Sequence, residues 1–350
     1  MKRVITIQDR QIGPGRPAYI IAEMSANHQQ DFAQAVKLVE AAKAAGADAI
    51  KLQTYTPDTL TIDCDQAPFR IQGTLWAGRT LYDLYGEAYT PWEWQPRLQQ
   101  IAQELGLHCF STPFDSTAVD FLEDMHVPAY KIASFENVDL PLLRRVARTG
   151  KPIIMSTGMA ELAELDEAVR TIREAGGTQL ALLKCTSAYP ALPAEANLRT
   201  IPHLAEAFGV VAGLSDHTLG WAVPVAAVAL GACIIEKHFT LSRALAGPDS
   251  AFSLEPSEFR AMVEAVRSAE QALGTVHYGV SPHEAPSRML RRSLFVVQDI
   301  KTGEPLTSEN IRAIRPGHGL HTRYLDDVLQ RRASQDIPRG TPLRWTHIAG

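Results

Sequence analysis

Eight short apolar runs punctuate the first 240 residues of the chain, and nearly all of them end in polar, reactive side chains. A parallel strand that is buried on both faces is expected to be apolar throughout, so the exceptions are informative. The polar residues near the C-terminal ends of these runs are Glu23, Lys51, Thr112, Lys131, Ser134, Ser156, Lys184, His217 and His238. In a closed barrel these ends meet at one mouth, where catalytic groups lie. The pattern therefore predicts a single functional site assembled from the strand ends.

Strand and helix patterns alternate from about residue 18 to about residue 274. The expected helices cover residues 31–46, 90–106, 115–125, 140–148, 159–175, 197–208, 219–231 and 256–273. Eight strands alternating with eight helices predict an α/β fold, a (β/α)8 TIM barrel. An open doubly wound sheet is the competing fold, but no glycine-rich fingerprint follows the first strand.

One connection in this pattern is abnormally long. Residues 56–90 separate the second strand from its helix, whereas such loops usually have about 2–6 residues. The segment and the start of the next helix are rich in aromatic residues: Phe69, Trp76, Tyr82, Tyr85, Tyr89, Trp92 and Trp94. It is interpreted either as a surface excursion that packs its own aromatic side chains or as a wall or lid over the barrel mouth.

The barrel pattern stops near residue 275. We expect a catalytic domain over residues 1–275 and a linker over 276–290, which contains Gly279, Pro282 and Pro286. Short β-like runs separated by Gly- and Pro-containing turns then predict a second, small domain over residues 291–350.

Composition excludes several classes of protein. The chain has 350 residues, 45% of them hydrophobic, and a net charge of −5, so no nucleic-acid partner is expected. The N-terminal apolar run is too short for a signal peptide, and no apolar stretch is long enough to span a membrane. The four cysteines are scattered without close pairs, which favours a cytoplasmic, reducing location.

Two histidines end neighbouring strands. His217 and His238 follow the seventh and eighth apolar runs, so both imidazoles are expected to reach one ion at the mouth. A single histidine in a strand is usually structural, but two on adjacent strand ends favour a metal site. Two nitrogens completed by oxygen ligands suit Mn²⁺ or Mg²⁺ better than structural zinc. Asp216 and Glu236 lie close in sequence, although strand alternation can direct them elsewhere.

Three lysines lie inside strands and are flanked by apolar residues. Lys51, Lys131 and Lys184 each point into a core or a site, and buried lysine is rare without a partner. One of them alone is compatible with a structural ion pair or a Schiff-base amine. Together with nearby serine and threonine hydroxyls, they favour a cradle for a dianion such as phosphate.

Longer motifs carry a family resemblance. AEMSANH, KLQTYTPDTLT, STPFD, YKIAS, STGM, KCTSAYP, GLSDHT, EKHFT and GPDSAFSLEP resemble, in order and spacing, the sialic acid synthase family. RPGHG, near the C-terminus, resembles part of the family's antifreeze-like (SAF) domain. Members are transferases that condense phosphoenolpyruvate with an acylamino sugar. The resemblance implies a divalent metal cofactor (Mn²⁺, Mg²⁺ or Co²⁺) and a domain-swapped homodimer.

The resemblance also implies roles for individual residues. Glu23, His217 and His238 would be catalytic, and the two histidines would bind the metal. Phosphoenolpyruvate would bind to Lys51, Thr112, Lys131, Ser134, Ser156 and Ser215. Tyr189 and Asp249 would line the sugar site, and Arg315 would reach it from the other protomer. The sialic acid synthase string CTNIYP has asparagine at the position of Ser187.

Within the family, the string AEMSANH and the aromatic excursion are most similar to the branch that makes pseudaminic acid. Sialic and legionaminic acid synthases have an AEAGVNHNG-type string instead. The implied reaction joins phosphoenolpyruvate to 2,4-diacetamido-2,4,6-trideoxy-L-altrose and releases phosphate by C–O cleavage. The alternatives are an N-acetylneuraminic or legionaminic acid synthase, a metal-dependent aldolase that releases no phosphate, and a non-catalytic carbohydrate- or ice-binding protein.

Overall fold

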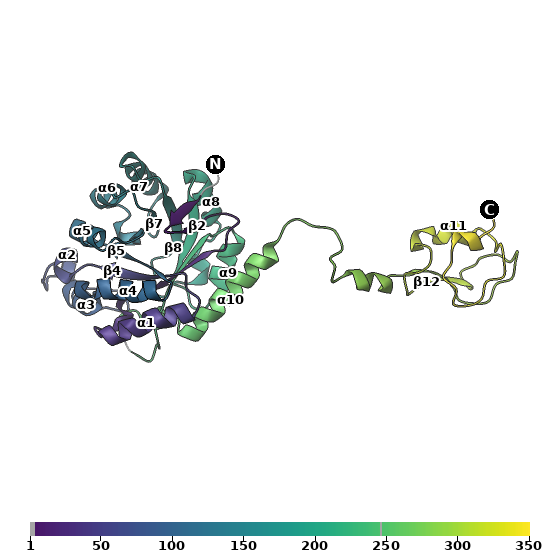
Figure 1. Cartoon of the computed structure of the whole chain (residues 1–350), viewed down its shortest axis with the longest axis horizontal. Helices are drawn as coiled ribbons and strands as arrows, with labels where there is room; N and C mark the ends of the chain where they lie inside the picture. The colour runs from purple at the N-terminus through teal and green to yellow at the C-terminus, as the bar shows by residue number, and fades with distance from the viewer. Residues whose placement is uncertain (1–3, 246) are drawn as a thin grey trace. The chain divides into compact units, whose positions relative to one another are not determined.

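The chain divides into two compact units, Met1–Gly274 and Thr275–Gly350, which are described separately. The structure is a computed structural model that describes residues 4–245 and 247–350. Figure 1 shows a barrel ringed by helices in the first unit and a small domain at the C-terminus.

The first unit is a closed barrel of eight parallel strands, as predicted from the alternating pattern. Around the barrel the order is β10-β3-β4-β5-β6-β7-β8-β9, so each strand lies beside its neighbour in sequence and β10 closes on β3. The strands are β3 (Tyr19–Glu23), β4 (Ala49–Thr54), β5 (His108–Pro113), β6 (Tyr130–Ile132), β7 (Ile153–Ser156), β8 (Leu180–Cys185), β9 (Val211–Asp216) and β10 (Ile234–His238).

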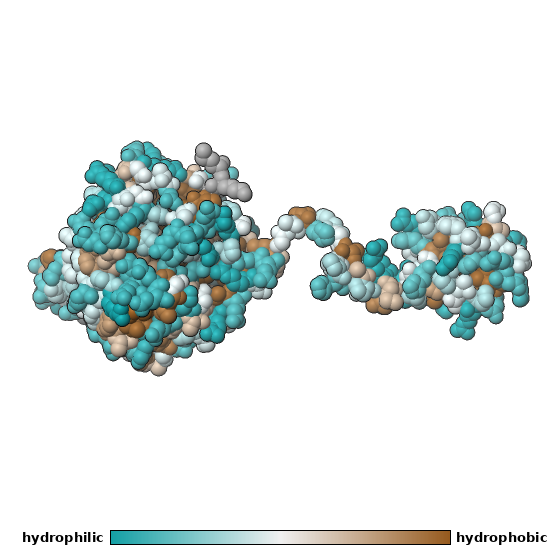
Figure 2. Space-filling view, viewed as in Figure 1, coloured by the Kyte–Doolittle hydropathy of each residue, from teal (hydrophilic) through white to brown (hydrophobic). Residues whose placement is uncertain are grey.

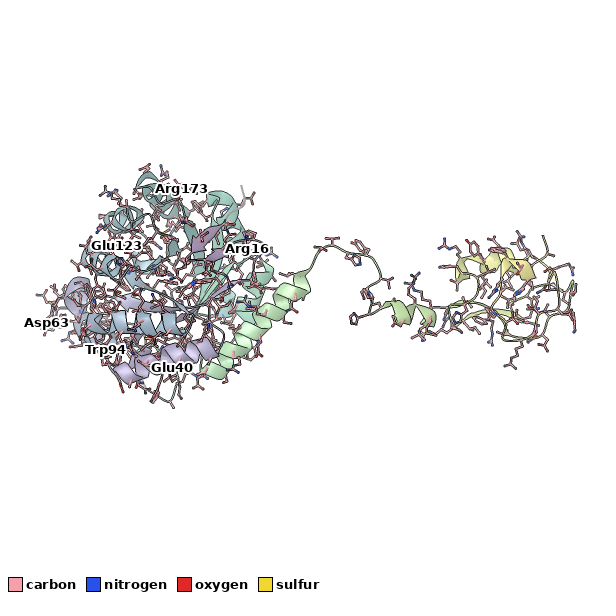
Figure 3. The ribbon with its side chains drawn as sticks, viewed as in Figure 1. Arg16, Glu40, Asp63, Trp94, Glu123 and Arg173 are labelled. Atoms are coloured by element: carbon pink, nitrogen blue, oxygen red, sulfur yellow. The ribbon has the colours of Figure 1, made fainter. Side chains whose placement is uncertain are left out.

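Helices follow the strands and form the outer layer. They are α1 (Phe32–Ala44), α4 (Gln95–Glu104), α5 (Ser116–Asp124), α6 (Leu140–Ala147), α7 (Leu162–Glu174), α8 (Thr200–Phe208), α9 (Ala222–Ala229) and α10 (Pro256–Leu273). In α6 the apolar Leu142, Leu143 and Val146 are buried against the strands. Charged residues such as Glu40, Glu123 and Arg173 lie on these outer helices, as Figure 3 shows. The face shown in Figure 2 is accordingly mostly hydrophilic.

A β-hairpin lies at the other end of the barrel from the strand C-termini. Strands β1 (Ile5–Ile7) and β2 (Arg10–Ile12) pair antiparallel, and Ile5, Ile7 and Ile12 are buried. They belong to one apolar cluster with Tyr19, Ile21, Ala49, Phe110, Ala129, Ile154, Ala181, Leu183, Val211, Cys233 and Ile234. These strand residues lie toward the N-terminal ends, so the polar interior is confined to the C-terminal mouth.

The long segment after β4 has short helices of its own, α2 (Pro57–Leu60) and α3 (Leu81–Ala88). The helix expected to begin at Thr90 begins later, at Gln95 of α4. A 3₁₀ turn at Trp92–Trp94 precedes α4, and the Thr90 hydroxyl contacts the His28 imidazole at 3.1 Å instead.

The second unit contains β11 (Ser293–Val296) paired antiparallel with β12 (Ile311–Ile314), and helix α11 (Leu325–Leu329). Its own small core includes Leu294, Ile300, Leu306, Val328 and Leu343. Across the described residues of both units, no helix is long and apolar enough to cross a membrane.

Candidate active site

Four charged side chains meet inside the mouth of the barrel. Lys51 Nζ lies 2.5 Å from Glu23 Oε2 and 3.6 Å from Glu236 Oε1, and Lys131 Nζ lies 3.6 Å from the same Glu236 oxygen. All four side chains are buried. Two ammonium groups and two carboxylates therefore share a space from which water is largely excluded, and buried charges of this kind are rare unless paired.

Three hydroxyl groups surround these charges. Lys51 donates to Thr112 Oγ1 at 3.2 Å, Lys131 donates to Ser156 Oγ at 2.6 Å, and Ser215 Oγ donates to Glu236 Oε1 at 3.1 Å. The predicted residues from strands β3, β4, β5, β6, β7 and β9 are thus brought together in one cluster. Ammonium and hydroxyl donors in this density are suited to an anionic ligand.

The two carboxyl groups of the cluster have pKa values shifted in opposite directions. Burial raises the pKa of Glu23, and Lys51 only partly opposes this effect. Burial also acts to raise the pKa of Glu236, but Lys131 and Lys51 outweigh it and leave that pKa below its ordinary value. Glu236 is therefore the carboxylate that compensates the lysines, while Glu23 is the one closer to accepting a proton.

His217 and His238 lie side by side beyond this cluster. Their ring centroids are 5.3 Å apart with an interplanar angle of 54°. His217 Nδ1 lies 2.9 Å from the Thr186 carbonyl oxygen, which leaves Nε2 as the nitrogen available to a ligand. His238 Nδ1 is buried without a hydrogen-bond partner. Burial, reinforced by His217 and Lys51, lowers the pKa of His238 well below its ordinary range, so its imidazole is neutral as a metal requires.

The residues present fit a divalent ion held partly by the protein. An orphaned buried ring nitrogen beside a second oriented imidazole is the donor set expected of a ligand pair. Among the described residues no group of three or more His, Cys, Asp or Glu side chains could hold a metal. Water or substrate oxygens would have to complete the coordination.

Gly158 marks a second cradle of donors, on the loop after β7. Its backbone nitrogen lies 3.1 Å from Ser134 Oγ. A Cβ atom at this position would lie 2.2 Å from Ser187 Oγ and 2.6 Å from Ser134 Oγ. Only glycine lets the two hydroxyl groups approach the backbone this closely. Ser134, a predicted anion ligand, therefore belongs to a compact donor group together with Ser187.

A pocket of about 410 Å³ opens next to the histidines. Its polar side contains Ser25, Gln53, Glu136, Tyr189, His238 and Asp249, and its apolar side includes Tyr55, Leu60, Ile71, Trp76, Leu81, Leu84, Tyr85, Phe114 and Phe135. Much of the apolar side comes from residues 56–90, so this segment is a wall of the pocket. Tyr82 does not line it, because its hydroxyl contacts Asp58 at the surface.

Tyr189 and Asp249, both predicted for a sugar site, line this pocket. The Tyr189 ring lies 4.4 Å from the His217 ring and 5.7 Å from the Trp76 ring, between centroids. The pocket is therefore continuous with the histidine pair and has both apolar and hydrogen-bonding surfaces, as an acylamino sugar would need.

The expectation that Lys184 belongs to the anion cradle is wrong, and strand alternation explains where Lys184 and the two acids near the histidines point. Lys184 lies between Leu183 and Cys185, which point inward, and its ammonium instead donates to the Cys185 carbonyl oxygen at 2.7 Å. Asp216 likewise faces away from the site and pairs with the buried Lys237 at 2.5 Å. Glu236 lies two residues before His238 on the same strand, so both side chains point to the same face. Glu236 is therefore the acid that enters the site.

Glu136 is a further site residue without an obvious signal in the sequence. It lies in the 3₁₀ turn Ser134–Glu136, lines the pocket, and has its Oε2 atom buried without a partner. Burial raises the pKa of Glu136 to about 7. A pocket-lining carboxyl group with such a pKa is a candidate acid or base.

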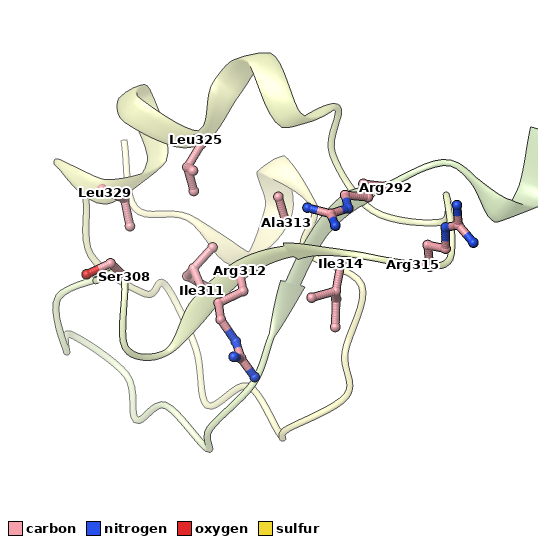
Figure 4. Close-up of a pocket in the computed structure, with 9 residues that line it drawn as sticks. All are labelled: Arg292, Ser308, Ile311, Arg312, Ala313, Ile314, Arg315, Leu325 and Leu329. Carbon is pink, nitrogen blue, oxygen red and sulfur yellow. The ribbon is translucent and has the colours of Figure 1, made fainter.

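Arg315 lies in the second unit, at the end of β12. It lines a surface pocket of about 700 Å³ together with Arg292, Arg312, Ile311 and Leu325 (Figure 4). Three arginines around an apolar floor give this domain a basic surface.

Comparison with known proteins places the chain in a family. Residues 38–278 match the NeuB family model and residues 291–349 match the SAF domain. A pseudaminic acid synthase of Helicobacter pylori is 47% identical, covering 94% of this chain and 97% of the relative. An N,N'-diacetyllegionaminic acid synthase of Legionella pneumophila is 37% identical, covering 96% of each.

A solved structure is similar in fold as well. The N-acetylneuraminic acid synthetase of Leptospira borgpetersenii serovar Hardjo-bovis, in complex with citrate, aligns with a TM-score of 0.73 and 31% identity over 82% of this chain and 95% of that one. The barrel, the appended domain and these matches agree: the chain is a member of the NeuB family with a C-terminal SAF domain.

Proposed function

We propose that this protein condenses phosphoenolpyruvate with 2,4-diacetamido-2,4,6-trideoxy-L-altrose to give pseudaminic acid and phosphate, a transferase reaction that proceeds by C–O cleavage. The observation that carries the proposal is the buried cluster of two lysines and three hydroxyl groups beside a partly apolar pocket. The cluster suits an enol phosphate, and the pocket suits a deoxygenated sugar with two acetamido groups. The 47% identity to a pseudaminic acid synthase, against 37% to a legionaminic acid synthase, supports this acceptor.

Phosphoenolpyruvate would occupy the mouth of the barrel. Lys51 and Lys131 would neutralise its charges, with Thr112, Ser156 and Ser215 as further donors. Ser134 and Ser187 would hold the phosphate, because their hydroxyl groups lie together beside Gly158, whose amide donates to Ser134 Oγ and orients it. These groups would stabilise the phosphate more strongly in the transition state, as it departs, than in the bound substrate. Only this difference in stabilisation lowers the barrier.

His217 and His238 would hold the divalent metal, for which Mn²⁺ and Mg²⁺ are the best candidates and Co²⁺ is a third. When bound there, the ion supplies Lewis-acid polarisation of the acceptor's aldehyde oxygen. The Thr186 carbonyl fixes the tautomer and orientation of His217, while Tyr189 and Phe252 pack against both rings. The imidazoles are thereby oriented before substrate enters.

Glu23 would stabilise the positive charge that develops at C2 of phosphoenolpyruvate when C3 attacks the aldehyde, and would position the water that adds to C2. Its Oε2 atom faces Lys51 and its Oε1 atom accepts from Gln53 at 3.0 Å, so the carboxylate is held in one orientation. Glu136, at the acceptor pocket, would donate the proton that the aldehyde oxygen gains when it becomes a hydroxyl group.

Steady-state assays with three candidate acceptors test the proposed function. We expect kcat/KM for the diacetamido altrose to exceed that for N-acetylmannosamine and for the legionaminic acid precursor. With ¹⁸O in the bridging oxygen of phosphoenolpyruvate, the label should appear in phosphate. Label retained in the keto acid, turnover without phosphate release, or preference for another acceptor would each overturn the assignment.

Gly158→Ala is expected to raise KM for phosphoenolpyruvate by about 100-fold or more, because the new methyl group fills the space between two hydroxyl donors. Gly86→Ala is the matched control, since a Cβ there meets only Pro57 at an ordinary 3.9 Å. Initial rates at varied phosphoenolpyruvate would measure the effect. An unchanged KM in a folded Gly158→Ala protein would remove the phosphate from this cradle.

We also propose a cytoplasmic homodimer in which the SAF domain of one protomer serves the barrel of its partner. The four cysteines are all free, which suits a reducing compartment. Exposed apolar residues on successive loops at the barrel mouth, Phe135, Val138, Met159, Leu192, Leu219 and Trp221, would be covered by the second copy.

Mixing two inactive variants tests this arrangement. His217→Ala removes a residue of the barrel and Arg315→Ala removes one of the SAF domain. If Arg315 acts across the dimer, a mixed dimer contains one barrel with all its groups, and partial activity returns after the two proteins are unfolded and refolded together. No recovery in mixed dimers isolated with two affinity tags would show that Arg315 acts within its own chain.

A further inference from the structure

Ser25 has an unusual backbone conformation at the edge of the site. It is the second residue after β3, and its φ angle is +47°, in the left-handed region that disfavours any residue with a Cβ atom. The residue is nevertheless serine, and it is 2% exposed. A strained, buried, polar residue next to a binding pocket is a reason to ask what its side chain does.

The hydroxyl group of Ser25 is fully engaged. It donates to Asp249 Oδ2 and accepts from Gln53 Nε2 at 3.1 Å. The other strong contact of the same Gln53 amide is with Glu23 Oε1 at 3.0 Å. A continuous chain of polar contacts therefore joins Glu23, at the phosphoenolpyruvate cluster, to Asp249, on a loop more than 220 residues away in sequence.

Ser25, Gln53 and Asp249 all line the acceptor pocket. Asp249 is half-buried, and its described hydrogen-bond donors are the Ser25 hydroxyl and, at 3.4 Å, the Ala26 amide. The Trp76 indole nitrogen donates to the carbonyl of the adjacent Pro248 at 2.9 Å, so the aromatic wall is anchored to the same loop. The Ser25 hydroxyl thus fixes the carboxylate on one side of the pocket relative to the wall on the other.

We propose that Ser25 is a positioning residue that sets acceptor specificity, by holding Asp249 and Gln53 where they hydrogen-bond the polar substituents of the sugar. The inference rests on the proposed function for the identity of the acceptor. A hydrogen bond between a hydroxyl and a carboxylate that lines a pocket restricts the carboxylate to one rotamer, and specificity depends on the polar groups of the pocket being paired correctly. The left-handed backbone aims the hydroxyl between its two partners.

Ser25→Ala and Ser25→Gly separate the hydroxyl from the backbone. Both lose the hydrogen bonds, but only glycine relieves the unfavourable φ angle. We expect kcat/KM for the diacetamido altrose to fall about 10- to 100-fold in both variants, the range for losing a hydrogen bond to a charged group. KM for phosphoenolpyruvate and Mn²⁺ affinity should stay within about 2-fold of wild type, because Ser25 contacts neither cluster. The preference over N-acetylmannosamine should shrink.

A double-mutant cycle with Asp249→Asn identifies the partner through which Ser25 acts. If the hydroxyl works by holding Asp249, adding Ser25→Ala to Asp249→Asn should cost far less than Ser25→Ala costs alone. His126→Gly is the matched backbone control: His126 is exposed, has φ of +54°, and lies in the turn after α5, so this change should leave every kinetic constant unaltered.

The outcomes distinguish the two proposals. If the wild-type enzyme fails to use the diacetamido altrose, the proposed function fails irrespective of Ser25. If the wild type uses it and both folded Ser25 variants retain its kcat/KM and its preference, Ser25 has no role in specificity. A rise in KM for phosphoenolpyruvate as large as the loss of kcat/KM for the sugar would also overturn the inference. So would full additivity of Ser25→Ala with Asp249→Asn, because either result assigns Ser25 a general structural role.

Discussion

His217→Ala and His238→Ala are each expected to leave a folded protein whose kcat/KM is lowered by about 10³-fold or more. Metal polarisation of a carbonyl is worth several kcal/mol, and each 1.36 kcal/mol is a factor of ten in rate. The two rings lie 5.3 Å apart, so each variant removes half of the imidazole pair. Mn²⁺ binding, followed by electron paramagnetic resonance of the free ion, should weaken in both variants even without substrates.

Alanine at either position also removes packing against Tyr189 and Phe252. His238→Gln is therefore a useful second variant, because it preserves much of the volume while removing the imidazole. Circular dichroism and thermal unfolding would verify the fold. His203→Ala, on the exposed face of α8, is the control and should bind Mn²⁺ like the wild type. Wild-type affinity for Mn²⁺ in both histidine variants would remove the metal from this pair.

The barrel could be predicted from the sequence because its signal is repeated. Each buried parallel strand is a short apolar run, and each is followed by a helical pattern. The structure confirms this alternation in a closed, sequentially ordered barrel. Individual helix starts were harder to predict: the helix expected from residue 90 begins at Gln95, and Thr90 contacts His28 instead.

The direction of single side chains in a strand could not be predicted with the same accuracy. Successive side chains of a strand point to opposite faces, so an error of one residue moves a side chain from the site to the outer layer. Lys184 and Asp216 were candidates by type, yet they point outward, while Glu236 points inward beside His238. Nothing in the local sequence of β8 distinguishes the two faces, since both are covered by apolar groups.

Residues on loops were the hardest to assign. Glu136 has no motif of its own, and its role depends on loops that meet only in the folded barrel. Ser25 did carry a signal. It replaces the glycine of the AEAGVNHNG-type string, and a serine where glycine is typical becomes meaningful once the φ angle of +47° is known.

Glu136→Gln is expected to make the protein both more stable and much less active. Burial raises the pKa of Glu136 to about 7 from an ordinary value of 4.5, so the folded state binds this proton more tightly than the unfolded state does. The contribution of the carboxyl group to stability is therefore greatest below pH 4.5 and is lost as the pH rises through about 7. Glutamine cannot ionise and avoids this loss.

At pH 8 we expect the free energy of unfolding of Glu136→Gln to exceed that of the wild type by about 2 kcal/mol, less than the full shift implies because the side chain is partly exposed to water. At pH 4 the two proteins should be equally stable. Urea titrations at both pH values would measure this, with the exposed Glu40→Gln as a control that changes neither.

The same substitution should lower kcat by about 10²- to 10⁴-fold, the usual contribution of a positioned acid or base. The wild-type profile of kcat against pH should contain a titration that Glu136→Gln lacks, whereas Mn²⁺ affinity should be unaffected. An active variant with an unchanged profile would reduce Glu136 to a pocket-lining residue. A gain in stability together with a loss of activity would instead show that a carboxyl group whose ionisation costs the fold free energy is retained at this position for catalysis, because burial outweighs the stabilising effect of the nearby lysines on its charge.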